Sequence, residues 1–347
     1  MPKSEHLDNI LDLQAKMRGG LDRDAQPHLF NRIDWLDYLI RYAMPKDRQY
    51  LFLTSGGDNA RAVLPLYKHG FGQYHSLSNW YNFTFQPIFS GCKDLPDRMA
   101  LLRAIAVNAH QKMWHICLTP VPDEDDITDQ IITAFTQSGW IAYTRPIDEN
   151  HILRLNGRSF DEYWATRPGQ LRNTVKRKAK KNAVSIRIDK NFTPENWRDY
   201  EKIYAKSWKP GEGNPVFLQN LAKNEAEYGS LRLGLAYADD VPVAAQFWTV
   251  ENGHALIHKL AHDEKYKNLS AGSLLSAALF QHVIDVDKVD IIDFGTGSDP
   301  YKKDWMEEVR HRNRINLYWP AHPCSWPYIV KNKLVALAER KKNGQDS

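Results

Sequence analysis

The sequence predicts a mixed α/β protein made of two related halves. Each half runs through helices, three consecutive strands, a helix and a further strand. In the second half, residues 254–286 place an apolar strand, a small-residue corner and a helix in direct succession. A chain of 347 residues is long enough for two domains of ordinary size. We expect an N-terminal domain over 1–145, a C-terminal domain over 146–322 and a basic helical tail over 323–347.

Composition sets the broad class of the protein. A hydrophobic share of 42% and a charged share of 25% are ordinary for a globular chain, and a net charge of +4 neither favours nor excludes a nucleic-acid partner. Cys92, Cys117 and Cys324 are far apart and odd in number, which fits a reducing compartment and excludes a zinc site built from cysteines. The N-terminus has no apolar signal core, and no run of about 18 apolar residues occurs. We therefore expect a cytoplasmic protein without membrane insertion.

The elements of the first half follow from apolar periodicity and turn residues. Strands are predicted over 49–54, 61–67, 71–77, 114–118 and 140–144, and helices over 5–19, 32–43, 98–112 and 123–138. The aromatic segment 78–89 has no helical period, and Pro87 argues against a central strand there.

The second half has clearer signals. Ser159 with Glu162 predicts a capping box, and Thr193-Pro194 predicts a helix start. Strands are predicted over 151–155, 184–188, 231–238, 241–250, 254–262, 289–294 and 315–319, and helices over 159–166, 168–182, 194–207, 216–228, 271–286 and 326–342. The halves share this order without any residue-level repeat.

The corner of residues 270–273 is a candidate phosphate cradle. Ser270 occupies the N-cap position of the following helix, and Ala271, Gly272 and Ser273 form its first turn. The first backbone N–H groups of a helix are open to an anion, and the helix dipole favours negative charge there. A small-residue helix start without a ligand is the alternative.

Three stretches carry a resemblance to a known family. Residues 266–275 (YKNLSAGSLL) are similar to a Y-x-x-x-S-P-G-x-L-L motif, with Ala271 in place of proline. Residues 293–302 (DFGTGSDPYK) are similar to D-F-G-x-G-x-x-x-Y-K, and residues 171–177 (LRNTVKR) to L-R-x-x-x-[KR]-[KR]. Together they make the chain similar, over about 160–320, to Fem-like acyltransferases of the GNAT superfamily. The resemblance is strongest to the bacterial acetyltransferase-6 group, which is associated with cellulose and polysaccharide synthesis. The fuller Arg/Gln-x-x-Gly-x-Gly/Ala loop of standard GNAT enzymes is missing.

The resemblance implies tandem GNAT-like domains and acyl transfer to an amine. The donor is a thioester such as acetyl-CoA, or aminoacyl-tRNA in Fem proteins. Backbone groups of the donor strand at Leu260, Ala261 and His262 would bind the donor and polarise its carbonyl. A carboxylate or histidine would take the proton of the amine, and an acid would return one to the thiolate.

Four residues are candidates for this proton chemistry or for charge. Asp263 follows the donor strand as a possible base, or caps the strand end, and Glu264 is a weaker rival. Tyr301 lies where GNAT enzymes place a general acid, or packs in the core. By resemblance, Lys302 would face substrate phosphates and the reacting carbonyl.

Other polar residues have two interpretations each. Lys267 either approaches a phosphate or is an exposed loop lysine, and Asp293 either accepts hydrogen bonds from the Gly-Thr-Gly turn or acts on the acceptor. His258 and His262 alternate with apolar residues, which is more typical of structural histidines.

Two surface features suit substrate binding. Six cations lie within residues 171–182, and Arg172 and Lys176 are four apart, so they share a helix face that could hold phosphate of a sugar nucleotide, CoA or tRNA. A solvated helix face is the common explanation of such a run. Trp80 and Tyr81 could stack on a sugar, although core packing is the more common role.

The sequence therefore predicts an N-acyltransferase that moves an acetyl group from acetyl-CoA to an amine, without a metal. The C-terminal domain would bind the donor, and a degenerate N-terminal domain would serve the acceptor, an amino sugar or polysaccharide precursor. One alternative is transfer from aminoacyl-tRNA, and tRNA is the one nucleic-acid partner expected. The other is a non-catalytic GNAT scaffold that binds nucleic acid or another anion.

Overall fold

The chain divides into two compact units. The computed structural model describes residues 2–343. Unit 1 is formed by residues up to 148 together with those from 311 onward, and unit 2 by residues 149–310. The second predicted boundary differs from this division, because residues 312–318 pair with β6 of unit 1.

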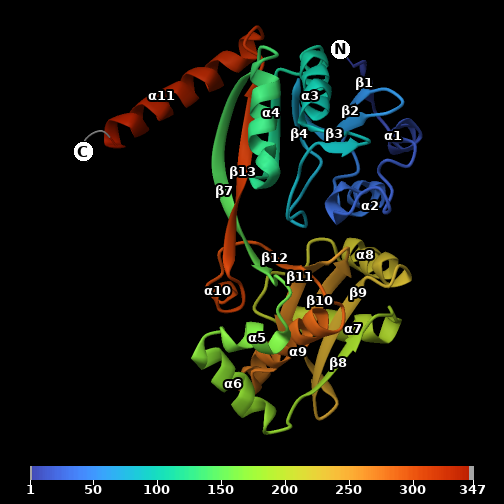
Figure 1. Ribbon diagram of the computed structural model, residues 1–347, viewed down its shortest axis with the longest axis vertical. Helices are drawn as coiled ribbons and strands as arrows, with labels where there is room; N and C mark the ends of the chain where they lie inside the picture. Colours follow the sequence, from blue (N-terminus) through green and yellow to red (C-terminus); the bar gives the residue numbers. More distant parts are fainter. Residues whose placement is uncertain (1, 344–347) are drawn as a thin grey trace. The chain divides into compact units, whose positions relative to one another are not determined.

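Unit 1 is a mixed sheet with helices on it (Figure 1). Its strand order is β1-β2-β3-β4-β6-β13, with β4 and β6 parallel and the other neighbours antiparallel. Helices α3 and α4 pack side by side over the core. The elements are β1 Ser4–Leu7, α1 Ile10–Met17, α2 Ile33–Tyr38, β2 Tyr50–Gly56, β3 Arg61–Gly70, β4 Gln73–Ser76, β5 Ile88–Ser90, α3 Leu95–Ala109, β6 His115–Pro122, α4 Ile127–Thr136, β7 Ile141–Arg154, β13 Glu308–Tyr318 and α11 Trp326–Asn343.

Unit 2 has its own core and six neighbouring strands of the sheet. Its strand order is β7-β12-β11-β10-β9-β8. Its elements, after the second part of β7, are α5 Phe160–Ala165, α6 Gly169–Ala179, β8 Ser185–Asp189, α7 Pro194–Ala205, α8 Pro215–Glu227, β9 Leu231–Ala238, β10 Val241–Glu251, β11 His254–His262, a 3-10 turn Glu264–Leu269, α9 Ala271–Asp285, β12 Ile291–Thr296 and α10 Lys302–Trp305.

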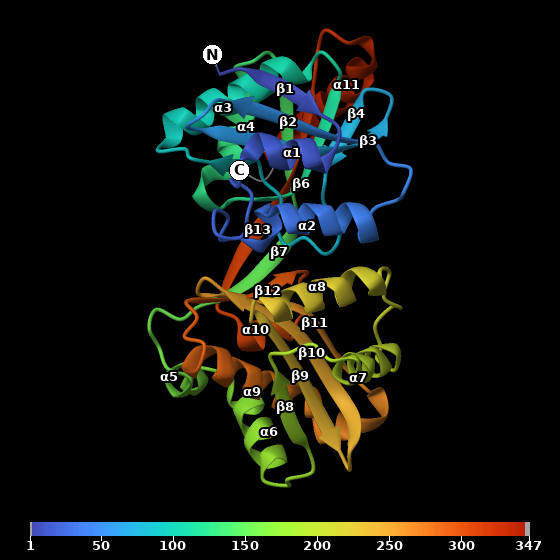
Figure 2. The ribbon, with the colours of Figure 1, turned by 90° about the vertical axis from the view of Figure 1, so that its right-hand side faces the viewer.

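Helices α7 and α9 cover opposite faces of the unit 2 sheet (Figure 2). Phe247 of β10 packs against Trp197 of α7, whereas the adjacent Gln246 donates a hydrogen bond to Ser276 of α9. Successive side chains of a strand point to opposite faces, so the two helices lie on different sides. Gly234 of β9 lets α9 approach closely, because an added Cβ would lie 2.7 Å from Leu279.

The same order of elements occurs in both units. In unit 1 the antiparallel strands β2, β3 and β4 lead to helix α3 and to β6, which is parallel to β4. In unit 2, β9, β10 and β11 lead to α9 and to β12, which is parallel to β11. The next strand beside each parallel strand comes from the other half of the chain. Strand β6 pairs with β13, and β12 pairs with β7. The predicted mixed α/β fold with two related units is confirmed.

Local signals explain most boundaries, and a few predictions were wrong. The expected helix over 5–19 is a strand and a shorter helix, since residues 4–7 pair with β2 and Asn9 caps the helix by accepting from the Asp12 N–H at 2.8 Å. The capping box of Ser159 and Glu162 and the Thr193-Pro194 helix start are present. The strands expected at 140–144 and 151–155 form one long strand, β7.

Candidate functional site

A cavity of about 330 Å³ opens in unit 2 where two parallel strands diverge. Strand β11 pairs with β12 only from His254 to Leu256, opposite residues 291–293. Beyond this point β11 continues to His262, so its backbone groups on that side face the gap rather than β12. The cavity is lined by Trp208, Gln246, Leu260, Ala261, His262, Tyr266, Lys267, Ser270, Ala271, Gly272, Ser273, Ser276, Phe294, Tyr301 and Trp305.

The structure brings all the residues predicted to bind the donor to this one cavity. They come from the end of β11 (Leu260, Ala261 and His262), from the following turn (Lys267) and from the helix start (Ser270, Ala271, Gly272 and Ser273). Their shared location gives the small-residue corner a concave surface, which the sequence could not establish.

The first turn of α9 presents its backbone to the cavity. The first intrahelical hydrogen bond runs from the Leu274 N–H to the Ser270 carbonyl at 3.0 Å. The N–H groups of Ala271, Gly272 and Ser273 precede it and have no acceptor within the helix. Ser270 adopts a left-handed conformation with φ 56°, and its side chain does not cap the helix, unlike the usual N-cap serine. An anion is the natural partner for these N–H groups.

Gly272 keeps part of the cavity open. A Cβ built on Gly272 would lie 3.6 Å from His262 Nδ1, an ordinary contact, and the glycine is helical. The fold would therefore accept a side chain here, and the glycine leaves room for something other than the protein.

Gln246 fixes the helix start, and the sequence analysis missed it. Its Nε2 donates to Ser276 Oγ at 2.7 Å and to the Gly272 carbonyl at 3.3 Å, while its Oε1 accepts from Trp248 Nε1 at 2.9 Å. A buried amide in an otherwise apolar strand was the signal that could have found it.

Asp263 is engaged as a cap. Its side chain is 3% exposed, accepts from the Lys265 N–H at 3.0 Å and lies 3.7 Å from Lys206 Nζ. Asp263 is not one of the residues that line the cavity. Glu264 lies 3.1 Å from His262 Nε2. Of the two expectations for Asp263, the structure shows the cap.

Tyr301 lines the cavity and keeps its proton. Its ring packs edge-on against Phe294 with centroids 5.7 Å apart. Burial, reinforced by the Asp299 carboxylate, raises the pKa of Tyr301 far above its usual value. The phenol is therefore a hydrogen-bond donor at neutral pH.

Lys302 and Asp293 hold the Gly-Thr-Gly turn. The buried Lys302 ammonium donates to the Thr296 carbonyl at 2.6 Å and to the Gly295 carbonyl at 3.2 Å. Asp293 accepts from the Gly295 N–H at 2.7 Å and from Asn150 Nδ2 at 3.1 Å. Neither side chain is among those lining the cavity, and both hold the turn through these contacts.

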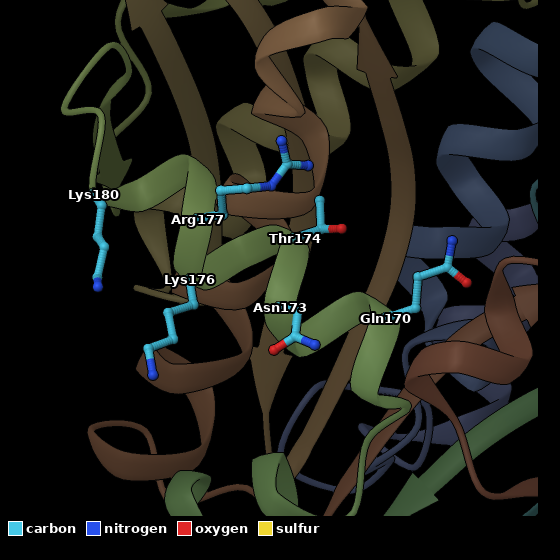
Figure 3. A pocket seen from close by; sticks show the side chains of 6 residues that line it. All are labelled: Gln170, Asn173, Thr174, Lys176, Arg177 and Lys180. Carbon is cyan, nitrogen blue, oxygen red and sulfur yellow. The ribbon is translucent and has the colours of Figure 1, made fainter.

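Helix α6 carries a basic surface (Figure 3). An open hollow of about 640 Å³ is lined by Gln170, Asn173, Thr174, Lys176, Arg177 and Lys180, and these six include no acid. Lys176 and Lys180 project to the same side of the helix in Figure 3. Arg172 is not part of the hollow. Lys178 donates to the carbonyl of Asn268, so α6 is tied to the turn that leads into α9.

Trp80 and Tyr81 lie in unit 1. Tyr81 is buried, as the packing interpretation expected, while Trp80 is 56% exposed. Their ring centroids are 4.3 Å apart. Only Trp80 of this pair presents much of its ring to solvent.

Two features are absent from the described residues, 2–343. No helix there is long and apolar enough to cross a membrane. No group of three or more His, Cys, Asp or Glu side chains in that part of the chain could hold a metal ion.

Comparison with known proteins identifies a domain within unit 2. Residues 169–303 match the family model of an acetyltransferase (GNAT) domain, the acetyltransferase-6 group. Unit 2 carries a GNAT domain. The match begins at α6, contains every cavity-lining residue except Trp305 and ends in α10. The repeated element order makes unit 1 a second GNAT-like unit.

Solved structures share the fold of the tandem GNAT-like chain at low identity. FemX is 10% identical, with a TM-score of 0.60 over 90% of this chain and 96% of its own. A conserved protein of unknown function from Bacteroides thetaiotaomicron is 14% identical, with a TM-score of 0.58 over 92% and 100%. L-PGS from Bacillus licheniformis is 13% identical, with a TM-score of 0.51 over 89% and 97%. No curated protein sequence matches the chain.

Proposed function

We propose that unit 2 binds an acyl-CoA, with acetyl-CoA as the simplest donor, and transfers its acyl group to an amine. The observation that carries this proposal is the cavity between the diverging strands β11 and β12, closed at one end by the N-terminus of α9. A phosphate cradle and an open strand edge in one cavity suit a ligand that has a pyrophosphate followed by a chain of amides.

Each part of the donor has a matching surface. The N–H groups of Ala271, Gly272 and Ser273, with Lys267 beside them, would take the pyrophosphate. The amides of the pantetheine arm would pair with the free edge of β11, as an added strand does. Gly272 leaves space for this close approach.

The chemistry requires little from the protein. A backbone N–H of β11 at the thioester carbonyl would stabilise the negative charge that develops on its oxygen. The Tyr301 phenol, which hydrogen-bonds the Asp299 carboxylate here, stays protonated and would turn its O–H to the leaving sulfur. Transfer is direct in this proposal and needs no covalent enzyme intermediate.

An acyl-transfer assay tests the proposal. The protein would be incubated with acetyl-CoA and a set of amines, including glucosamine, and both free thiol and acylated amine would be measured. Thiol release matched by an N-acetyl product is expected for at least one amine. Failure to bind or turn over acetyl-CoA under these conditions would contradict the proposal.

The basic surface of α6 favours a second candidate, transfer from aminoacyl-tRNA. Arg172, Lys176 and Lys180 follow one another at intervals of four residues, which sets them in a row along the helix. A row of cations suits a phosphodiester backbone as well as the phosphates of CoA. RNA affinity that falls steeply with added salt, without acetyl-CoA binding, would favour this candidate.

A further inference from the structure

The segment 206–214, between α7 and α8, lies along the end of β11. Lys206 Nζ is 3.7 Å from the Asp263 carboxylate just after the strand, and the Trp208 ring lies over His262 with centroids 4.6 Å apart. Trp208 is also part of the cavity lining. The segment therefore borders the cavity at the end of the strand that would hold the donor.

The same segment brings a carboxylate to β11. Glu212 Oε2 is 3.0 Å from Lys259 Nζ, and the two side chains are only 11% and 8% exposed. Tyr204 of α7 also hydrogen-bonds Glu212, and the Lys259 ammonium lies 5.8 Å from the centre of the Tyr204 ring. Glu212 is thus held in a fixed place by two donors.

This pair lies across the sheet from the helix start. Lys259 is opposite Phe247 of β10, whose ring faces α7, whereas the next residue, Leu260, is opposite Gln246, which faces α9. A ligand in the gap between β11 and β12 could therefore have its phosphates on the α9 side and its reactive end near Glu212. Trp208, in the same segment as Glu212, borders the cavity.

Burial of the pair is hard to explain by stability alone. A buried ion pair gains little over an apolar pair of the same size, because both charges lose their water. Burial, partly offset by Glu212, lowers the pKa of Lys259 to about 8, and Lys209 adds to the shift. Perturbed charged groups are typical of functional sites, and Lys259 immediately precedes Leu260 of the cavity lining. Asp263, the carboxylate expected from the sequence, is already a cap.

We propose that Glu212 receives the amine of the acceptor and takes its proton, with Lys259 and Tyr204 as positioning residues. This inference rests on the proposed acyl transfer. Glu212 first takes a proton from the ammonium, which frees the lone pair of the amine nitrogen to attack the acyl carbon and form the C–N bond. The C–S bond then breaks, its electron pair stays on the sulfur of CoA, and the thiolate takes up the second N–H proton of the amine. Glu212 releases its own proton to solvent.

A Glu212→Gln variant, with Glu227→Gln as the exposed control on α8, tests this role. Acetyl-CoA transfer would be measured with glucosamine, which is largely protonated at neutral pH, and with hydroxylamine, which is already unprotonated. Glu212→Gln should slow transfer to glucosamine by roughly 10²-fold or more, the usual contribution of a general base, and change hydroxylamine-dependent release far less. Acetyl-CoA affinity should stay within about twofold of wild type, since the donor surface is unchanged.

The double variant Glu212→Gln with Lys259→Met is the control for a folding defect. It removes both buried charges and keeps their volume, so its thermal transition should match wild type while glucosamine transfer stays slow. Equal rates for Glu212→Gln and Glu227→Gln with glucosamine would overturn this inference and leave the acyl transfer intact. Equal losses with both nucleophiles, together with lost donor binding, would assign Glu212 a structural role instead. A wild-type protein that transfers to neither amine would overturn both proposals.

Discussion

At the scale of single residues, the site combines residues that are contiguous in sequence with residues that are far apart. Only the contiguous ones can be recognised from the sequence. The corner Ser270-Ala271-Gly272-Ser273 is contiguous, so its small side chains and the following helical period predict a helix start from sequence. Glu212 is 47 residues from Lys259 along the chain, and no local pattern marks the pair. The substrate-facing role expected for Lys302 stays a prediction, and the two carbonyls that its ammonium contacts could not be foreseen from sequence.

A buried histidine predicts how stability depends on pH. His258 lies 2.8 Å from Thr249 Oγ1, and burial, followed by the neighbouring Lys259 ammonium, lowers its pKa to about 3. In the unfolded chain this histidine takes up a proton near pH 6.5, whereas in the folded state it stays neutral until the pH is near 3. Its contribution to the free energy of unfolding is therefore fully present above pH 6.5 and is lost as the pH falls toward 3. Each such proton contributes a slope of about 1.4 kcal/mol per pH unit.

Urea unfolding of His258→Gln and of the exposed control His311→Gln, at several pH values between 7 and 4, measures this slope. The His258 variant should lose free energy of unfolding less steeply than wild type as the pH falls, whereas the His311 variant should follow wild type. Parallel slopes for wild type and His258→Gln would show that this histidine does not limit acid stability.

At the scale of elements, helix and strand identity was more predictable than extent. Capping residues such as Ser159 and Thr193 indicate helix starts because their side-chain bonds are local. Strand β7 was read as two short strands, since residues 145–149 are mostly polar and exposed and carry no apolar alternation. Pairing with β12, which is distant in sequence, holds the following residues from Asn150 to Arg154 in the same strand.

Helix α6 predicts a charge effect on phosphate binding. Lys176→Glu with Lys180→Glu should weaken acetyl-CoA binding by at least about fivefold at low salt, with a smaller effect at high salt, if this surface attracts the phosphates of the donor. None of the residues of α6 is buried, so the melting temperature should hardly change. Binding measured across a salt series checks the expectation.

The matched control places the same charge change on unit 1, at the exposed residues Lys46 and Lys93. Equal weakening by the two pairs would mean that net charge, rather than the α6 surface, governs affinity. No effect from either pair would remove α6 from the donor site and leave the α9 cradle as the phosphate contact.

At the scale of the whole molecule, the main feature is the duplication of one unit. The order of predicted helices and strands indicates it, whereas a residue-by-residue comparison of the two halves does not. Both units contain a three-strand meander, a helix and a parallel strand, although the sequences of the halves show no repeat. The exchange of outer strands escaped prediction because it depends on pairing between segments far apart, such as β6 and β13. This exchange explains why the expected boundary at residue 322 differs from the observed division.

Cutting the chain tests the exchange. A fragment of residues 1–148 lacks the part of β13 that pairs with β6, and with it Arg312, whose buried guanidinium binds the Phe83 carbonyl at 2.9 Å and Glu124 at 2.7 Å. We expect this fragment to show no cooperative thermal transition. The edge of β6 is left open, and the acceptors that Arg312 contacts lose their donor. The contiguous fragment 149–310 has a core of its own and should melt cooperatively. Cooperative melting of 1–148 as a monomer would contradict this.

The central claim is that the start of α9 binds the anionic part of an acyl-CoA, and calorimetry of acetyl-CoA with two variants of Gly272 tests it most directly. Gly272→Asp and Gly272→Asn add side chains of nearly equal shape where a Cβ has room, and an acid near a helix N-terminus does not destabilise the helix. We predict binding to wild type, weaker binding to the asparagine variant and loss of binding to the aspartate variant, whose charge opposes the pyrophosphate. Equal affinities for the two variants, or no heat with wild type at high acetyl-CoA concentration, would contradict the account.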